Sequence, residues 1–292
     1  MRFIKQKPGR SLQAEKNTHR VLAGVLFILA FSCGFYLTFP DTLLKQTLTN
    51  QFEKHFRVQL ELTEANLLPL LTLSCKQASI SMPSEAMPFL QIESFSLSPK
   101  WLSTITGDPG IKGQLQSSPG QISFQWQKSG ELEILGNDMP FEIPLATSPA
   151  MRIAGTLKTA AIETDVPIKK QTESLLEISL GNVAIRGLGA LSGHQNGLKL
   201  GSLTLQATGR GNAFTITKFQ TIEGDLLIAG QGTLILAAAD PIKSRINLNL
   251  RVTAGRSADP TLSSLLELAG TKQADGSRKL QLAGTLANPT IR

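Results

Sequence analysis

The stretch Ile246-Asn-Leu-Asn-Leu-Arg-Val252 decides the fold class of this chain. Its apolar residues stand at every second position, and polar or charged residues fill the positions between them. Because successive side chains on a β-strand point to opposite faces, this period of two predicts a strand with one buried face and one solvated face. Strands of this kind are typical of antiparallel sheets.

The same alternation recurs along most of the chain, in short runs bounded by glycine, proline, asparagine or serine. The runs are Val58/Leu60/Leu62, Leu90/Ile92, Phe95/Leu97, Ile122/Phe124/Trp126, Leu132/Ile134, Leu176/Ile178/Leu180, Leu198/Leu200, Leu203/Leu205, Phe214/Ile216, Leu226/Ile228, Leu234/Leu236 and Ile246/Leu248/Leu250/Val252. Turn signals stand at Ser129-Gly130, Gly136-Asn137-Asp138, Gly209-Arg210-Gly211-Asn212 and Asp275-Gly276. We therefore expect a mainly β fold built on an extended antiparallel sheet.

Two segments carry helical signals instead. Apolar residues recur at every fourth position from Leu44 to Phe56, which predicts a short amphipathic helix over about Thr42–His55. Asp259-Pro260 places a capping acid before a proline at the first helical position, and Gly270 closes the second helix. Two short helices cannot cover a dozen strands. The sheet must therefore bury its apolar face against another sheet, against itself by curling, or against something that is not protein.

Prolines cluster in the middle of the chain. Pro140, Pro144 and Pro149 are expected to interrupt strand pairing, because proline has no backbone N–H to donate to a sheet ladder. They predict an internal boundary near 137–150 within a β-rich part that covers 40–292.

Residues Val21 to Phe39 (VLAGVLFILAFSCGFYLTF) contain no charged side chain. At about 1.5 Å per residue, a helix of this length spans roughly 28 Å, close to the ~30 Å hydrocarbon core of a bilayer. The preceding tail, 1–20, carries six basic residues and one acid. Because positive residues stay on the cytoplasmic side, we expect a single transmembrane helix at 21–39 with the tail inside and 40–292 across the membrane.

Two alternatives to a retained anchor exist. A cleaved signal peptide has a similar charge pattern, but its apolar region is usually about 7–15 residues long and ends in small residues. Here the bulky segment Phe35–Phe39 fills that place. A lipoprotein site at Cys33 is the other alternative, although Ala30-Phe31-Ser32 matches the usual Leu-small-small run poorly. The sequence therefore favours the anchor.

The net charge of +7 does not indicate nucleic-acid binding. Of the 29 basic and 22 acidic residues, the first twenty positions hold six and one, which leaves 23 basic and 21 acidic residues for the rest. The basic excess thus belongs mostly to the tail, where it fits topology and attraction to anionic lipid.

Residues that could carry chemistry are few. His19, His55 and His194 lack metal-ligand neighbours at suitable spacing, and no paired-cysteine motif occurs. Cys33 and Cys75 would lie in different phases and cannot pair within one chain. Cys75 is expected to be a small buried hydrophobe, with a bridge between chains left open.

Three further features have ordinary structural explanations. Gly187–Gly193 superficially has the form of a dinucleotide loop, but its last gap is wrong, so a glycine-rich strand connection is expected. Glu131 and Glu133 are expected to be solvated charges rather than an acid/base pair. Trp101 and Trp126 are expected to pack in the core or on a sheet face. The sequence predicts no catalytic, metal-binding or cofactor-binding residue, and hence a protein that is not an enzyme.

The layout resembles one known family. After the tail, the apolar segment and the amphipathic helix comes His55-Phe-Arg-Val-Gln-Leu-Glu-Leu-Thr-Glu-Ala-Asn-Leu-Leu-Pro-Leu-Leu-Thr-Leu73, and the chain ends with Leu282-Ala-Gly-Thr-Leu-Ala-Asn-Pro-Thr-Ile291. This resembles the type II secretion system protein N (GspN) family and, more distantly, AsmA-like inner-membrane proteins. The likeness covers most of the chain but rests on layout and strand phrases, and it transfers no functional residue.

Two functions follow from this resemblance. The GspN likeness implies a non-catalytic component of the type II secretion system in the bacterial inner membrane. Its bulk would lie in the periplasm and contact other secretion subunits, for which exposed strand edges are natural docking sites. The AsmA likeness implies a lipid-binding or lipid-transfer protein of the cell envelope that holds phospholipid acyl chains in an apolar sheet groove.

Overall fold

The computed structural model describes residues 41–56, 59–81, 90–145, 148–188, 197–237, 240, 243–286 and 288–291. The expected tail and transmembrane helix at 1–39 lie outside these residues. Within them, no helix is both long enough and apolar enough to cross a bilayer.

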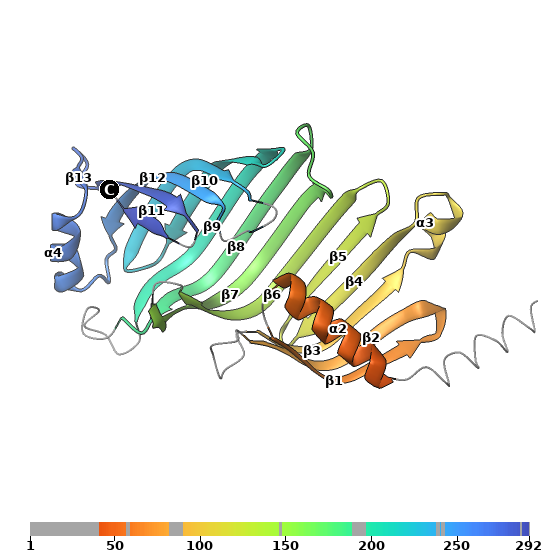
Figure 1. Cartoon of the computed structure of the whole chain (residues 1–292). Coiled ribbons are helices and arrows are strands. Elements are labelled where there is room, and N and C mark those ends of the chain that lie inside the picture. The colour runs from red at the N-terminus through yellow and green to blue at the C-terminus, as the bar shows by residue number, and fades with distance from the viewer. Residues whose placement is uncertain are drawn as a thin grey trace, which may run out of the picture.

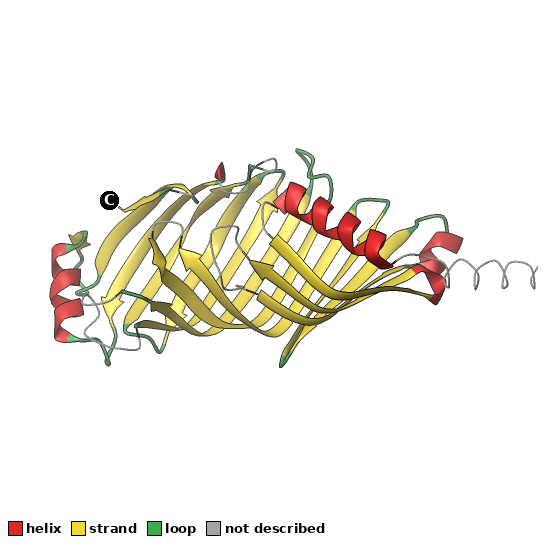
Figure 2. Ribbon diagram, turned by 60° about the horizontal axis from the view of Figure 1, so that its bottom comes forward, coloured by secondary structure: helices red, strands yellow, loops and turns green. Residues whose placement is uncertain are grey.

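One large open antiparallel sheet makes up most of the described chain. Its strands are β1 (Gln59–Leu68), β2 (Thr72–Ser81), β3 (Leu90–Pro99), β4 (Gly110–Ser117), β5 (Gly120–Gln127), β6 (Glu131–Leu145), β7 (Ser148–Asp165), β8 (Glu173–Arg186), β9 (Leu198–Arg210), β10 (Ala213–Ile222), β11 (Leu226–Ile235), β12 (Arg245–Ala254), β13 (Thr271–Lys272), β14 (Arg278–Thr285) and β15 (Pro289–Ile291). From β1 to β12 each strand pairs with its neighbours in the sequence, and β14 then joins β12, β13 and β15. The sheet bends into a long trough (Figures 1 and 2).

The helices stand at the two ends of this trough. Helix α2 (Asp41–Phe56) lies over β1 to β3, and α4 (Pro260–Leu268) stands at the opposite end (Figures 1 and 2). Both helices were expected from the sequence. Asp259 caps α4 by accepting a hydrogen bond from the Thr261 N–H at 2.7 Å, and Gly270 follows with a φ of +61°. A five-residue helix, α3 (Trp101–Ile105), and a 3₁₀ turn, η1 (Pro69–Leu71), were not expected.

The prediction of a turn at Gly136-Asn137-Asp138 is wrong. These residues lie inside β6, where Asn137 pairs with Gln121 of β5 and Thr159 of β7. Asp138 has a φ of +48° and marks a local irregularity in the strand rather than its end. Short polar residues and glycine suit positive φ in either setting, so the residue types could not distinguish a turn from an irregular strand position.

Pairing also continues through the prolines of 137–150. Pro140 lies opposite Thr156 and Pro144 opposite Arg152, so the expected interruption does not occur between β6 and β7. Pairing between β6 and β5, however, stops at Asn137. The two prolines therefore lie in a half of β6 that is paired on one side only, which is where a sheet tolerates the missing N–H. No break in the sheet separates two parts within the described residues of this segment.

Candidate apolar groove

One face of the sheet is almost entirely apolar. In antiparallel strands, directly opposed residues share a face, so the face can be followed from strand to strand. In the middle of the sheet, Ile134 lies opposite Ile162, and Ile178 lies opposite Leu205. Farther along, Ile228 lies opposite Val252. Among the described strands, directly opposed pairing places charged residues on this face only at the far end of the sheet, where Arg278 of β14 lies opposite Val252 and Lys272 of β13 lies opposite Arg278.

The apolar face stays continuous because irregular positions correct the alternation. In β6 the apolar residues are Leu132 and Ile134 before the break and Met139 and Phe141 after it, a change from even to odd numbers. Asp138, at positive φ, stands at the change. A shift of one residue in a strand would turn every later side chain to the other face, and a bulge restores the original face. Comparable changes occur near Gln77 (φ 50°) in β2, Asn182 (φ 53°) in β8, Gly201 (φ 69°) in β9, and between Ile216 and Phe219 in β10.

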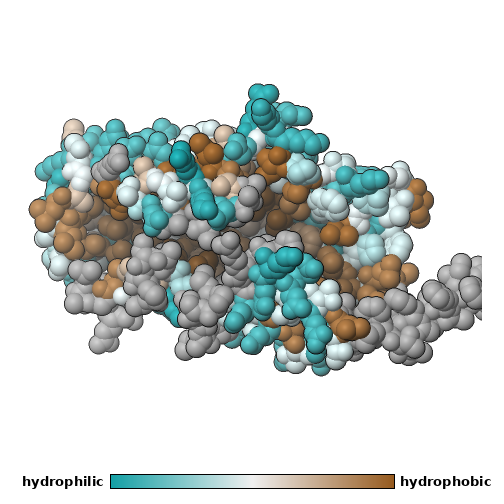
Figure 3. Space-filling view, viewed as in Figure 1, coloured by the Kyte–Doolittle hydropathy of each residue, from teal (hydrophilic) through white to brown (hydrophobic). Residues whose placement is uncertain are grey.

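This apolar face lines the inside of the trough. Figure 3, in the same view as Figure 1, shows hydrophobic residues gathered in the central hollow and hydrophilic ones along its outer margins. Many inner side chains, such as Leu176, Ile178 and Leu205, are only half-buried. The opposite face carries polar residues, for example Asn247 and Asn249 of β12. Asn249 lies opposite Gln281 of β14. We call the hollow the apolar groove, lined by the inward residues of β5 to β12.

Helix α2 covers the inner face of the sheet at its β1 end, beyond the groove strands. Leu48 packs against a buried cluster of Ala65, Leu73 and Cys75, and Lys45 donates a hydrogen bond to the carbonyl oxygen of Thr63. Cys75 is 1 % exposed and free, which confirms its prediction as a small buried hydrophobe. Burial raises the pKa of the Cys75 thiol, and the Lys45 ammonium opposes this effect. Cys33 lies outside the described residues.

A second cleft, at the rim of the sheet, is acidic. It has a volume of about 730 Å³ and lies over the ends of β6 to β9. Glu131 faces Asp165 across the strands, and Glu133 faces Glu163. Glu131 accepts a hydrogen bond from the Gln127 side chain at 2.6 Å. Glu131 is exposed and Glu133 half-buried, which fits charges in contact with solvent, as expected. Among the described residues, no three or more histidine, cysteine, aspartate or glutamate side chains are placed so that they could hold a metal ion together.

The other residues considered in the sequence lie apart from one another. Trp126 sits half-buried on the inner face opposite Ile111 and Leu132, as expected, whereas Trp101 begins α3 and is 43 % exposed. Gly187 follows β8, and the expected connection leads to β9, with residues 189–196 outside the described part. His55 belongs to α2, and His19 and His194 are not described.

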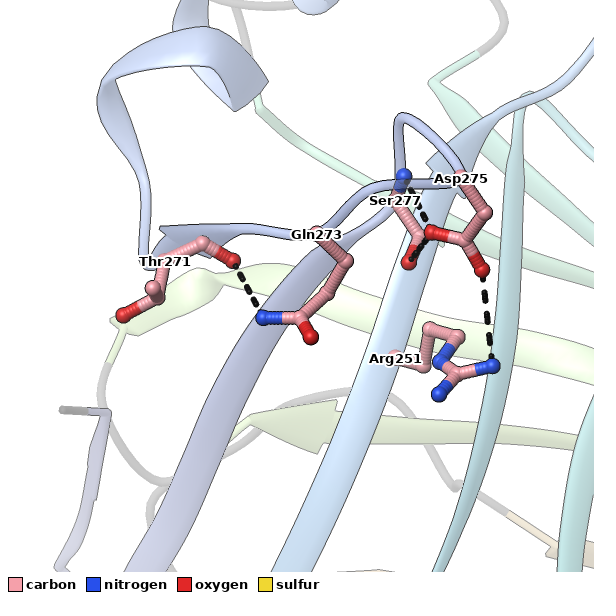
Figure 4. Close-up of polar contacts among 5 residues, drawn as sticks. All are labelled: Arg251, Thr271, Gln273, Asp275 and Ser277. Atoms are coloured by element: carbon pink, nitrogen blue, oxygen red, sulfur yellow. Dashed lines mark hydrogen bonds and ion pairs between the residues drawn. The ribbon is translucent and has the colours of Figure 1, made fainter.

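A polar turn joins β13 to β14, beyond the far end of the groove. Asp275 accepts hydrogen bonds from the backbone N–H of Ser277 at 3.0 Å and from its hydroxyl at 2.6 Å (Figure 4). Arg251 of β12 lies 3.4 Å from the other carboxylate oxygen. The Ser277 hydrogen bonds, together with Arg251, lower the pKa of Asp275. The turn was expected at Asp275-Gly276.

Sequence reasoning missed part of the groove lining. Inner residues of β7, such as Ile153, Leu157 and Ile162, belong to no predicted run, because the alternation changes between Leu157 and Ala160. The signal that could have found them is that change itself: two apolar runs of opposite parity with no turn residues between them.

Comparisons with known proteins add no identity. No family model, no curated protein and no solved structure matches this chain.

Proposed function

We propose that this protein is a membrane-anchored component of the bacterial cell envelope that binds phospholipid acyl chains in its apolar groove. The observation that carries the proposal is the continuous apolar inner face, which remains half-exposed along strands that no described helix covers. Large exposed apolar surfaces on proteins usually mark binding sites for apolar partners. The transmembrane helix expected at 21–39 would keep the groove beside its source of lipid.

The energetics of the groove suit an acyl chain better than a polar ligand. Each methylene group removed from water contributes about 0.8 kcal/mol, so even part of a chain gains several kcal/mol from an apolar lining. Polar ligands would find few partners there, because the inward residues of the central strands offer almost no hydrogen-bonding side chains. The buried polar groups, such as Ser244 and Asp225, lie at strand ends instead.

A charge on the groove floor tests the proposal. Ile178 faces Ala160 and Leu205 on the inner face, whereas the next residue, Ser179, faces Thr159 and Thr204 on the outer face. The full chain would be purified from membranes, and its bound phospholipid counted by mass spectrometry. We expect Ile178→Asp to lower the phospholipid per protein at least tenfold and Ser179→Asp to leave it unchanged. Circular dichroism would show that both variants fold.

Equal lipid content in the two variants, or no phospholipid in the unmodified chain, would contradict the proposal. A tenfold loss corresponds to about 1.4 kcal/mol of binding free energy. This is a small effect for a carboxylate placed against a hydrocarbon chain.

A second candidate function is a non-catalytic role in the type II secretion system. The observation in its favour is an open strand edge: β1 pairs with β2 alone in the described sheet, so its other edge offers backbone groups to a partner strand. Deletion of the gene, with measurement of secreted hydrolases and crosslinking from Glu61 or Asn66 of β1, would test it. Normal secretion without crosslinks to inner-membrane secretion subunits would rule it out.

A further inference from the structure

The β1 end of the sheet exposes a group of large apolar side chains outside the groove. Leu102 and Ile105 of α3 are 81 % and 82 % exposed, and Leu70 of η1 is 68 % exposed. Trp101, Leu71 and Leu43 are also exposed. Isolated exposed leucines are ordinary, but this many from three separate elements is not. We call Leu43, Leu70, Leu71, Trp101, Leu102 and Ile105 the apolar rim.

The strand register brings these elements to one end. Leu67 of β1 lies opposite Leu73 of β2, which lies opposite Leu97 of β3. Strands β1 and β3 therefore run in the same direction and end on the same side, so that η1 follows the end of β1 and α3 follows the end of β3. Figures 1 and 2 both show α3 and the first turn of α2 at this end of the molecule.

The chain order indicates what covers the rim. Helix α2 begins at Asp41, and the uncharged segment 21–39 ends two residues earlier in the sequence. If that segment crosses the membrane, the first turn of α2 must lie at the membrane surface, and the rest of this end lies beside it. A bilayer is then the apolar phase within reach of the rim.

The composition around α3 fits a bilayer surface. The helix itself, Trp-Leu-Ser-Thr-Ile, has no charged side chain. Lys100 precedes it, and Lys100 and Lys112 line a cleft of about 800 Å³ together with Trp101 and Leu102. Tryptophan settles at the level of lipid headgroups, and lysines near the surface attract anionic lipid.

We propose that the apolar rim inserts into the outer leaflet of the membrane that anchors the chain, and so holds the β1 end of the groove against the bilayer. This proposal rests on the membrane anchor of the proposed function and not on lipid in the groove. If another protein covered the rim instead, its burial would not depend on the membrane anchor.

Fluorescence quenching by brominated lipid tests the insertion. The chain has two tryptophans, so Trp126→Phe leaves Trp101 as the one tryptophan, whose emission is excited selectively over that of the single tyrosine. The full chain would be reconstituted in phosphatidylcholine nanodiscs with or without lipid brominated at carbons 6 and 7. We expect the brominated lipid to lower Trp101 emission at least twofold.

The opposite end of the sheet offers a matched control. Leu268 of α4 is 86 % exposed, as much as Ile105. In a chain carrying Trp101→Phe, Trp126→Phe and Leu268→Trp, we expect the emission to change by less than a tenth. Equal quenching at the two ends, or none at Trp101, would overturn the proposal. Brominated lipid confined to the groove would not favour Trp101 over the tryptophan at position 268.

A second measurement does not depend on Trp126. A photocrosslinking benzoylphenylalanine in place of Ile105 should react with phospholipid in nanodiscs, and one in place of Leu268 should not. Crosslinks from position 105 to protein alone would overturn the proposal. Release of the full chain from membranes by alkaline carbonate would refute the membrane anchor, and with it the insertion of the rim. If Trp101 were quenched but the groove held no phospholipid, only the proposal of lipid binding in the groove would be refuted.

Discussion

Asn182 should be required for β8 to keep its apolar residues on one face. Before it, Ile178 and Leu180 face the groove, and after it, Val183 and Ile185 do so, because Asn182 adds one residue at a φ of +53°. Deletion of Asn182 would turn Val183 and Ile185 outward, or force the end of β8 to slip against β7 and β9.

The cost of the deletion can be worked from burial. Val183 is 2 % exposed and Ile185 is half-buried. Full burial of such a side chain contributes about 1.5–3 kcal/mol, so the deletion should lower the free energy of unfolding by about 2–4 kcal/mol. With a urea m-value near 3 kcal/mol/M, the unfolding midpoint would fall by about 1 M. The measurement is urea unfolding of the full chain in detergent, followed by circular dichroism.

Two substitutions at the same position separate the extra residue from its conformation. Asn182→Gly keeps the residue and tolerates positive φ, so its unfolding midpoint should match that of the unmodified chain. Asn182→Val places a β-branched side chain in the left-handed region and should cost about 1–2 kcal/mol. If the deletion were no more destabilising than Asn182→Gly, the correction of strand parity described above would be refuted.

Three further predictions concern single groups. Because burial raises the pKa of Cys75, its contribution to stability is complete below the unfolded thiol pKa of about 8.5 and is lost as pH rises through the higher folded pKa. Urea midpoints from pH 7.5 to 10.5 should therefore fall further for the unmodified chain than for Cys75→Ala, and parallel curves would contradict this. Because the Ser277 hydrogen bonds and Arg251 lower the pKa of Asp275, its contribution is present above about pH 3.9 and is lost as pH falls through the lower folded pKa. Asp275→Asn should flatten the acid side of the stability profile, and an unchanged profile would show that the turn carries no such linkage. Asp259→Ala should cost α4 about 1 kcal/mol. Since α4 has no buried residue, the loss should appear as faster amide hydrogen exchange within Pro260–Leu268 rather than as a lower global midpoint, and unchanged exchange would argue against the cap.

The sequence predicted strands best where the alternation is unbroken. Strand β12 alternates without interruption, and the predicted run from Ile246 to Val252 lies wholly within it. Strand β9 was predicted as two runs, because its apolar residues change from even to odd positions near Gly201. From the sequence alone, such a change within a strand cannot be distinguished from a turn between two strands. The core cluster that joins Phe214, Ile216 and Leu248 also follows from the alternation.

Strand β4 shows why other elements were missed. Its inward position at Gly113 has no side chain, so the apolar alternation is absent from the sequence. The ring of Phe124 on β5 fills that space, since a Cβ on Gly113 would overlap the carbon atoms of that ring. The apolar surface thus comes from the neighbouring strand, which only the register reveals. Helix α3, with five residues, is too short to show a helical period.

The strictly sequential order of β1 to β12 has a consequence for how such a protein can change in length. Each strand contacts the strands before and after it in the chain, so a hairpin inserted at any turn would join the sheet without rerouting its neighbours. Stability would then grow by one hairpin at a time, as it does in repeat proteins. Local pairing also means that the sheet can assemble progressively from any hairpin, without long loops to close first. A longer or shorter trough is therefore accessible to evolution and to design by the addition or removal of whole hairpins.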